Sequence, residues 1–123
     1  MRILVIEDDY AHFHTIKMAL KYALDKDVAV DNALKLNDAI SFMKDKDYDL
    51  IISDLFLPYS STLMNTIENV IDNKRSATVI FCSAMNISKS DLEHIESKKW
   101  IFFPKNDRFP ENLKNMVKEK FFV

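Results

Sequence analysis

The sequence predicts an α/β fold in which one five-stranded parallel sheet carries helices on both of its faces. Short apolar runs typical of buried strands alternate from end to end with segments whose apolar residues recur at helical spacing. The strand-like runs are continuously apolar, as in parallel sheets that are covered on both faces. The length of 123 residues suits one domain. We therefore expect residues 1–123 to form a single doubly wound (βα)5 domain without a second domain.

Each of the five expected strands is followed by an expected helix. The strand-like runs cover residues 3–6, 28–30, 50–53, 79–82 and 101–103. Apolar positions with helical spacing follow over residues 10–24, 36–43, 63–71, 92–95 and 113–121. Asp8 or Asp9 is the expected N-cap of the first helix, and Ser88 or Ser90 that of the fourth. Residues 57–61 should form a loop, and residues 121–123 should dock the last helix on the sheet.

Composition and charge exclude several classes of protein. The chain is 48% hydrophobic and 29% charged, which is typical of a soluble globular protein. Its net charge of -2 gives no sign of the basic surface that nucleic-acid binding requires. No apolar run approaches the roughly 20 residues that span a bilayer. Cys82, the single cysteine, lies in an apolar run and suits a reducing compartment. We expect a cytoplasmic protein that binds neither nucleic acid nor membrane.

The chain contains no glycine. Phosphate-binding P-loops and dinucleotide-binding fingerprints both require glycines, so both are excluded. Tight turns and helix ends must use other residues, and asparagine tolerates the left-handed conformation better than most. We therefore expect left-handed backbone among four asparagines, which are Asn32, Asn73, Asn86 and Asn106.

Polar side chains follow four of the expected strands at the point where each strand ends. Glu7 and Asp8 follow the first strand, Asp54 the third, Ser83 the fourth and Lys105 the fifth. In an open parallel α/β sheet these ends share one edge, and ligands bind there. Gathered carboxylates repel one another by about 4 kcal/mol per pair at 4 Å and an effective dielectric of 20. A hard cation among the carboxylates, with an anion beside the hydroxyl and the ammonium, would account for this set.

The same residue types also have purely structural interpretations. Asp8 can cap a helix, and a serine such as Ser83 is more often a turn or cap residue. His12 and His14 suggest a metal pair, but residues two apart on a helix face different directions, so we expect no metal there.

Taken together, the strand-end residues resemble the signature of response-regulator receiver domains, the phosphorylation-controlled modules of two-component signalling. The resemblance rests on Glu7-Asp8, Asp54, Ser83-Ala84 and Lys105, in this order and each at an expected strand end. The segment Asp54-Leu55-Phe56-Leu57-Pro58 also resembles the family's phosphorylation loop. The resemblance covers the whole chain and implies a flavodoxin-like sheet with strand order 2-1-3-4-5.

The resemblance implies a phosphoacceptor and a metal site. Asp54 would accept the phosphoryl group. Asp8 would bind Mg²⁺ directly and Glu7 through water. The Asp54 carboxylate and the Phe56 backbone carbonyl would be further ligands. Mg²⁺ prefers hard oxygen ligands and keeps several of its waters, which agrees with these assignments.

The resemblance also implies how the signal is received and passed on. Ser83 and Lys105 would contact the phosphoryl oxygens, because phosphoryl transfer depends mainly on positioning and charge neutralisation. Phe102 stands where the family carries an aromatic switch residue, and core packing is an equally good interpretation. The phosphoryl donor would be a sensor histidine kinase or a histidine phosphotransfer protein, and output would pass through an unknown downstream protein. Beyond slow loss of its own phosphoryl group, the domain would not be an enzyme.

Three positions depart from the family pattern. The family has Lys-Pro with a cis bond where this chain has Lys105-Asn106. A cis bond without proline costs about 2.5–4 kcal/mol, so we expect a trans bond. Pro104 instead precedes the lysine, which suits an edge strand, and Thr62 replaces a family glycine. These changes concern loop geometry more than chemistry.

Two other functions compete with a phosphorylation switch. A receiver-like scaffold would bind its partners without phosphorylation, although the complete set of strand-end residues argues against it. A Mg²⁺-dependent hydrolase of the haloacid dehalogenase type needs a second aspartate two residues after the nucleophile, where this chain has Phe56.

Overall fold

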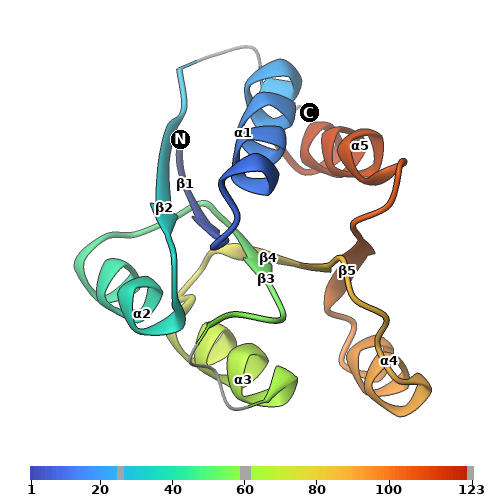
Figure 1. The fold of residues 1–123 in the computed structure, drawn as a ribbon. Helices are drawn as coiled ribbons and strands as arrows, with labels where there is room; N and C mark the ends of the chain where they lie inside the picture. The colour runs from blue at the N-terminus through green and yellow to red at the C-terminus, as the bar shows by residue number, and fades with distance from the viewer. Residues whose placement is uncertain (25–26, 59–61, 122–123) are drawn as a thin grey trace.

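The computed structural model describes residues 1–24, 27–58 and 62–121. Five strands and five helices alternate along these residues, as predicted (Figure 1). The strands are β1 (Arg2–Ile6), β2 (Ala29–Ala33), β3 (Leu50–Asp54), β4 (Thr78–Ser83) and β5 (Ile101–Pro104). The helices are α1 (Tyr10–Leu24), α2 (Leu36–Asp45), α3 (Leu63–Asn73), α4 (Lys89–Ser97) and α5 (Phe109–Phe121). Residues 59–61 of the expected loop and residues 122–123 at the chain end lie outside the described residues. None of the described helices is long and apolar enough to cross a membrane.

All five strands are parallel and form one sheet in the order β2-β1-β3-β4-β5. Ile52 in the central strand β3 pairs with Val5 of β1 on one side and with Ile80 of β4 on the other. This confirms the doubly wound parallel sheet that the residue pattern predicts and the flavodoxin-like strand order that the resemblance implies. Strand β5 lies at an edge, which is where a proline such as Pro104 can end a strand.

Helices α1 and α5 cover one face of the sheet, and α2, α3 and α4 cover the other (Figure 1). Because side chains alternate across a strand, neighbouring residues of β3 belong to different cores. Ile52 packs in the core beneath α1 and α5, whereas Ile51 packs in the core beneath the other three helices. Both side chains are fully buried, and such burial contributes about 1.5–3 kcal/mol each. The two cores fix the strands and, with them, the strand ends that carry the polar residues.

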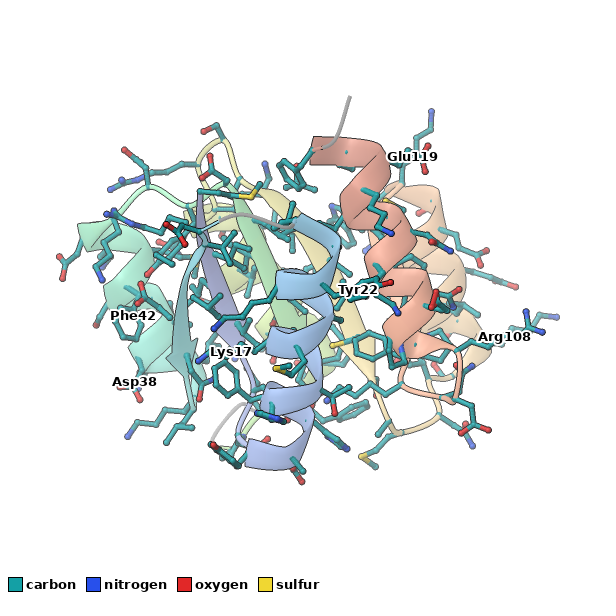
Figure 2. The ribbon with its side chains drawn as sticks, turned by 90° about the horizontal axis from the view of Figure 1, so that it is seen from above. Lys17, Tyr22, Asp38, Phe42, Arg108 and Glu119 are labelled. Atoms are coloured by element: carbon teal, nitrogen blue, oxygen red, sulfur yellow. The ribbon has the colours of Figure 1, made fainter. Side chains whose placement is uncertain are left out.

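Helices α1 and α5 pack side by side, and Tyr22 of α1 points toward α5 (Figure 2). The ammonium groups of Lys114 and Lys118 in α5 lie 4.7 and 5.4 Å from the centroid of the Tyr22 ring. A cation over an aromatic face at an exposed site contributes about 0.5–1 kcal/mol. The contacts of Tyr22 with these two lysines therefore stabilise the packing of α1 against α5 on the solvent-facing side.

Side-chain caps fix the starts of three helices. Asp9 Oδ1 accepts a hydrogen bond from the backbone N–H of His12 at 3.1 Å, so Asp9 and not Asp8 caps α1. Ser88 caps α4. Thr62, at the position of the family glycine, caps α3. The replacement of this glycine thus starts a helix, and the cap on Asp9 leaves Asp8 available for another role.

The expectation of left-handed asparagines is wrong. Among the described residues, the positive φ angles belong to Arg75 (54°) and Lys99 (59°). After Lys99, the N–H of Trp100 donates to the carbonyl of Ile95 at 3.3 Å, a helix-ending bond that usually surrounds a glycine. The Arg75 side chain donates to Asp47 Oδ1 at 2.5 Å. These bonds help to offset a backbone cost of about 1–3 kcal/mol at each position.

Strand β2 spans Ala29–Ala33 and therefore extends further than the predicted residues 28–30. The sequence signal ends early because Asp31 and Asn32 are polar. On this edge strand both side chains find partners: Tyr48 donates its hydroxyl to Asp31 Oδ2 at 2.6 Å, and Asn32 Nδ2 donates to the Val5 carbonyl at 3.0 Å. Polar residues with such partners continue a strand that an apolar pattern alone would end.

Candidate functional site

The carboxyl ends of β1 and β3 and the residue after β5 bring together most of the residues predicted for the site. Carboxylate oxygens of Glu7, Asp8 and Asp54 lie within 4.8 Å of one another. Lys105 reaches into this group, and its Nζ donates hydrogen bonds to Glu7 Oε2 and Asp54 Oδ2. The parallel topology thus gathers four predicted side chains from positions nearly a hundred residues apart in the sequence.

Lys105 is the positive centre of this group, and its side chain is 5% exposed. Its Nζ lies 2.9 Å from Asp54 Oδ2 and 3.3 Å from His12 Nδ1, in addition to its bond with Glu7. An ammonium has three donors, so these three contacts satisfy it. Burial acts to lower the pKa of Lys105, but its anionic surroundings outweigh burial and hold the pKa above its ordinary value. Lys105 is therefore charged at neutral pH.

Glu7 is the most deeply buried acid of the site, at 1% exposure. Burial raises the pKa of Glu7 to about 7, and repulsion from Asp54 acts in the same direction, whereas the hydrogen bond from Lys105 opposes both. Its second oxygen, Oε1, accepts the backbone N–H of Asp9 at 3.1 Å. A negative charge on Glu7 is therefore costly without a further cation.

The three carboxylates outnumber the single ammonium, so the ionised cluster carries excess negative charge. Glu7 and Asp54 are buried, whereas Asp8 is exposed at the rim of the site. Closely spaced carboxylate oxygens that are open to solvent on one side are the ligands that a hard divalent cation such as Mg²⁺ prefers, because the open side leaves room for its waters. The donor set therefore fits such a cation.

Asp54 ends the central strand, and each of its two oxygens has a fixed partner. Oδ1 accepts the backbone N–H of Phe56 at 2.9 Å, and Oδ2 accepts Lys105 at 2.9 Å. The observed contact of Phe56 uses its N–H, so the metal-binding role of its carbonyl stays a prediction. Charged and backbone donors on both oxygens hold the Asp54 carboxylate in one orientation.

Ser83 ends β4, and its hydroxyl is engaged locally. Ser83 Oγ accepts the backbone N–H of Met85 and donates to the Met85 carbonyl, both at 3.0 Å. The backbone carbonyl of Ser83 accepts the N–H of Lys105 at 2.8 Å, which extends the pairing of β4 and β5 by one residue. The bond between Lys105 and Asn106 is trans, as predicted. Ser83 therefore helps to place Lys105 through its backbone, while its hydroxyl would have to turn away from Met85 to reach an anion beside Asp54.

Two residues at the site were missed by the sequence analysis. Asn32 Nδ2 donates to the carbonyls of Val5 and Glu7 at 3.0 and 3.1 Å, and so holds the end of β1. His12 contacts Lys105 from the first turn of α1. The spacing of His12 from the capping Asp9 was the available signal, because the third residue after a cap lies in the first turn beside the preceding loop.

Comparison with known proteins decides the family. A family model of the response regulator receiver domain matches residues 3–118. The chain belongs to this family. Receiver domains as a class are signalling switches whose acidic pocket binds Mg²⁺. The comparison with curated proteins finds no match.

Solved structures of other receiver domains share the fold of this one. The receiver domain of a LuxO repressor protein from Vibrio parahaemolyticus is 24% identical, with a TM-score of 0.75 over 96% of this chain and 87% of that one. A CheY-like receiver domain protein from Methanospirillum hungatei is 19% identical, with a TM-score of 0.78 over 97% and 91%. The orphan response regulator HP1043 of H. pylori is 19% identical, with a TM-score of 0.75 over 98% and 95%. At these identities the likeness concerns the fold.

Proposed function

We propose that this receiver domain is a phosphorylation-controlled signalling switch and that Asp54 is its phosphoacceptor. The observation that carries the proposal is the position of the Asp54 carboxylate, which ends the central strand between a buried ammonium and two further acids. The donor would be a phosphohistidine of a sensor histidine kinase or of a histidine phosphotransfer protein. Output would pass through a downstream protein.

The proposed transfer is a single displacement at phosphorus. One oxygen of Asp54 forms a bond to phosphorus while the bond from phosphorus to the donor nitrogen breaks, and that nitrogen keeps the electron pair. The product is an acyl phosphate on Asp54. Lys105 already touches Asp54 Oδ2, so its ammonium lies next to the place where the phosphoryl oxygens arrive. A positive charge fixed in a water-poor site stabilises the charge that develops there.

The acidic group supports Mg²⁺ as the cofactor. Asp8 and Asp54 would bind the ion directly and Glu7 through water, and the Phe56 carbonyl would add a ligand. The bound ion would neutralise part of the phosphoryl charge. Meanwhile Glu7 would keep its hydrogen bond to the Asp9 backbone, which holds its carboxylate beside the other two.

Ser83 and Phe102 are the proposed route from phosphorylation to output. The Ser83 hydroxyl would leave the Met85 backbone and donate to a phosphoryl oxygen, which is the differential contact that a switch requires. Phe102 in β5 is half-buried and packs against the core beneath α2, α3 and α4. The face formed by α4, β5 and α5 would then change its packing. Amide exchange that differs near Asp54 alone, with none near Phe102, would contradict this route.

Mass spectrometry of the intact protein tests the proposed function. After incubation with Mg²⁺ and acetyl phosphate, the wild type should gain the mass of one phosphoryl group, and Asp54→Asn should gain none. Asp47→Asn is the matched control, because Asp47 is 82% exposed and is paired with Arg75 away from the site. Equal labelling of the wild type and Asp54→Asn would reject Asp54 as the acceptor. No labelling of the wild type would favour a scaffold that works without phosphorylation.

A further inference from the structure

His12 makes a contact with Lys105 that neither the sequence motif nor the proposed transfer uses. His12 Nδ1 lies 3.3 Å from Lys105 Nζ. The same nitrogen lies 3.9 Å from Glu7 Oε1, which is too far for a hydrogen bond. Because an ammonium can only donate, a hydrogen bond between these atoms requires Nδ1 as the acceptor, in the tautomer that carries its proton on Nε2.

The backbone of His12 is held by the same loop that carries the acids. Its N–H donates to Asp9 Oδ1 at 3.1 Å, and the N–H of Asp9 donates in turn to Glu7 Oε1 at 3.1 Å. One chain of hydrogen bonds therefore links the first turn of α1 to the buried carboxylate that also accepts Lys105. These bonds fix the position of the His12 backbone, and with it the Cα from which the side chain reaches the Lys105 ammonium.

The imidazole supplies the third of the three acceptors around the Lys105 ammonium. Without it, water would have to take the third bond. A pocket of about 110 Å³ adjoins the lysine and has room for water. Its lining residues are His12, Thr15, Lys105, Asn106, Phe109 and Pro110. A hydrated ammonium would no longer be held at one place beside Asp54.

We propose that His12 is a positioning residue for Lys105. Its Nδ1 holds the ammonium against Asp54 before transfer and keeps it within reach of the phosphoryl oxygens when the bond with Asp54 Oδ2 is exchanged for one with the phosphoryl group. The effect on phosphorylation rests on the proposed function. The contact itself does not, because it is present in the unphosphorylated protein.

Three substitutions at His12 distinguish the effect of the hydrogen-bond acceptor at the Nδ1 position from the effect of the size of the ring. The amide oxygen of His12→Asn can occupy the place of Nδ1. In His12→Gln the amide lies one bond further out, near the place of Nε2, and His12→Ala has no acceptor. His14→Ala is the control, because His14 is exposed on the same helix and stacks on Tyr10. Since His12 is 44% exposed, all four variants should fold.

Two measurements compare these variants, the rate of phosphorylation and the exchange of the Lys105 ammonium protons. Rates of phosphorylation by acetyl phosphate at saturating Mg²⁺ should fall about three- to tenfold in His12→Ala and His12→Gln, the loss expected for one partly exposed hydrogen bond to a charged group. The rates of His12→Asn and His14→Ala should stay within about twofold of wild type by the same reasoning. In NMR spectra of the unphosphorylated protein, the Lys105 ammonium protons should be protected from exchange in the wild type and His12→Asn but not in His12→Ala or His12→Gln.

The two measurements keep this proposal apart from the proposed function. A wild type that gains no phosphoryl group rejects the proposed function, and the NMR comparison still decides whether His12 holds Lys105. Equal ammonium exchange in the wild type and His12→Ala overturns the positioning role. Equal phosphorylation rates in the wild type and His12→Ala also overturn it, as does a His12→Asn variant no better than His12→Ala.

Discussion

Acidic side chains at the carboxyl ends of the strands have different surroundings from acidic side chains elsewhere in the fold. Asp31, in the middle of β2, and Asp47, just before β3, have partners of their own. Tyr48 and Lys46 bond Asp31 at 2.6 and 3.1 Å, and Arg75 bonds Asp47. These contacts join segments distant in sequence and act as structural cross-links.

At the edge where the strands end, three acids share one ammonium. Glu7, Asp8 and Asp54 lie together, and Lys105 bonds only the two buried ones. Burial raises the pKa of Glu7, whereas the hydrogen bond from Tyr48 lowers the pKa of Asp31 in β2. The acids with partners of their own stabilise the fold, whereas the cluster of Glu7, Asp8 and Asp54 carries excess negative charge that suits a divalent cation.

The largest expected effect is the loss of Asp8, the proposed direct ligand of Mg²⁺ at the carboxyl edge. Asp8→Asn should lower the rate of phosphorylation by acetyl phosphate about ten- to a hundredfold, because a carboxylate ligand becomes a neutral amide. The rate is measured by intact mass at fixed Mg²⁺. Asp47→Asn, just before β3, should keep the wild-type rate. If both variants react alike, the two groups of acids do not differ as described.

A second prediction concerns the lifetime of the phosphorylated state. Phe56 and Met85 are partly exposed, at 38% and 61%, and lie two residues beyond Asp54 and Ser83. They offer bulk and little hydrogen bonding to a water that attacks the phosphorus in line. The phosphoprotein should therefore decay over many minutes or longer. Phe56→Asn combined with Met85→Glu should speed the decay about tenfold by positioning that water.

Decay is followed by intact mass after removal of the donor. Loss within seconds in the wild type would reject the shielding role of Phe56 and Met85. Identical decay of the wild type and the double variant would show that both side chains merely cover the loop surface.

A third prediction concerns stability without metal. The folded pKa of Glu7, about 7, lies above its ordinary value of 4.5. The contribution of Glu7 to stability is therefore present below pH 4.5 and is lost as the pH rises through 7. With chelator present at pH 8, Glu7→Gln should raise the free energy of unfolding by about 1 kcal/mol, since the weaker bond from Lys105 to a neutral amide oxygen offsets part of the gain.

Denaturant unfolding at several pH values measures this difference. The advantage of Glu7→Gln should shrink toward zero at pH 4.5. A variant that is less stable than the wild type at pH 8 would mean that Lys105 fully compensates the buried charge.

The smallest expected effect concerns Asp31 in β2, away from the site. Tyr48→Phe removes the hydroxyl that bonds Asp31 at 2.6 Å, while Lys46 keeps its own bond to that acid. The free energy of unfolding should fall by about 0.5–1.5 kcal/mol, the usual net value of one hydrogen bond. Phosphorylation should proceed at the wild-type rate. A change in that rate would show that Asp31 and the site are coupled.

The sequence predicted the gathering of the charged residues for one physical reason, whereas the strand order was implied by the resemblance to receiver domains. Apolar runs identify buried strands, and parallel strands end at one edge, so the residues after each run must meet there. Glu7, Asp8, Asp54 and Lys105 follow from this rule. Side-chain direction does not follow from it, and the engagement of the Ser83 hydroxyl with Met85 became visible only in the structure.

The remaining features depend on contacts that a local pattern does not encode. His12 meets Lys105 across 93 positions of the chain. Left-handed backbone falls at Lys99 and Arg75 and not at the asparagines, because a helix-ending bond after Lys99 and the side-chain bond from Arg75 to Asp47 override a weak residue preference. The extent of β2 was underestimated because Asn32 is polar, although it bonds the carbonyls at the end of β1.

A Mg²⁺ titration of the unphosphorylated protein, followed by amide NMR, tests the central claim most directly. If the negative charge at the carboxyl edge holds a cation, the amide signals of residues 7–9 and 54–56 should shift saturably. Signals near Asp31 and Asp47 should stay in place, and the shifts should be lost in Asp8→Asn. No saturable shift at the carboxyl edge, or equal shifts there and near Asp31 and Asp47, would contradict the account.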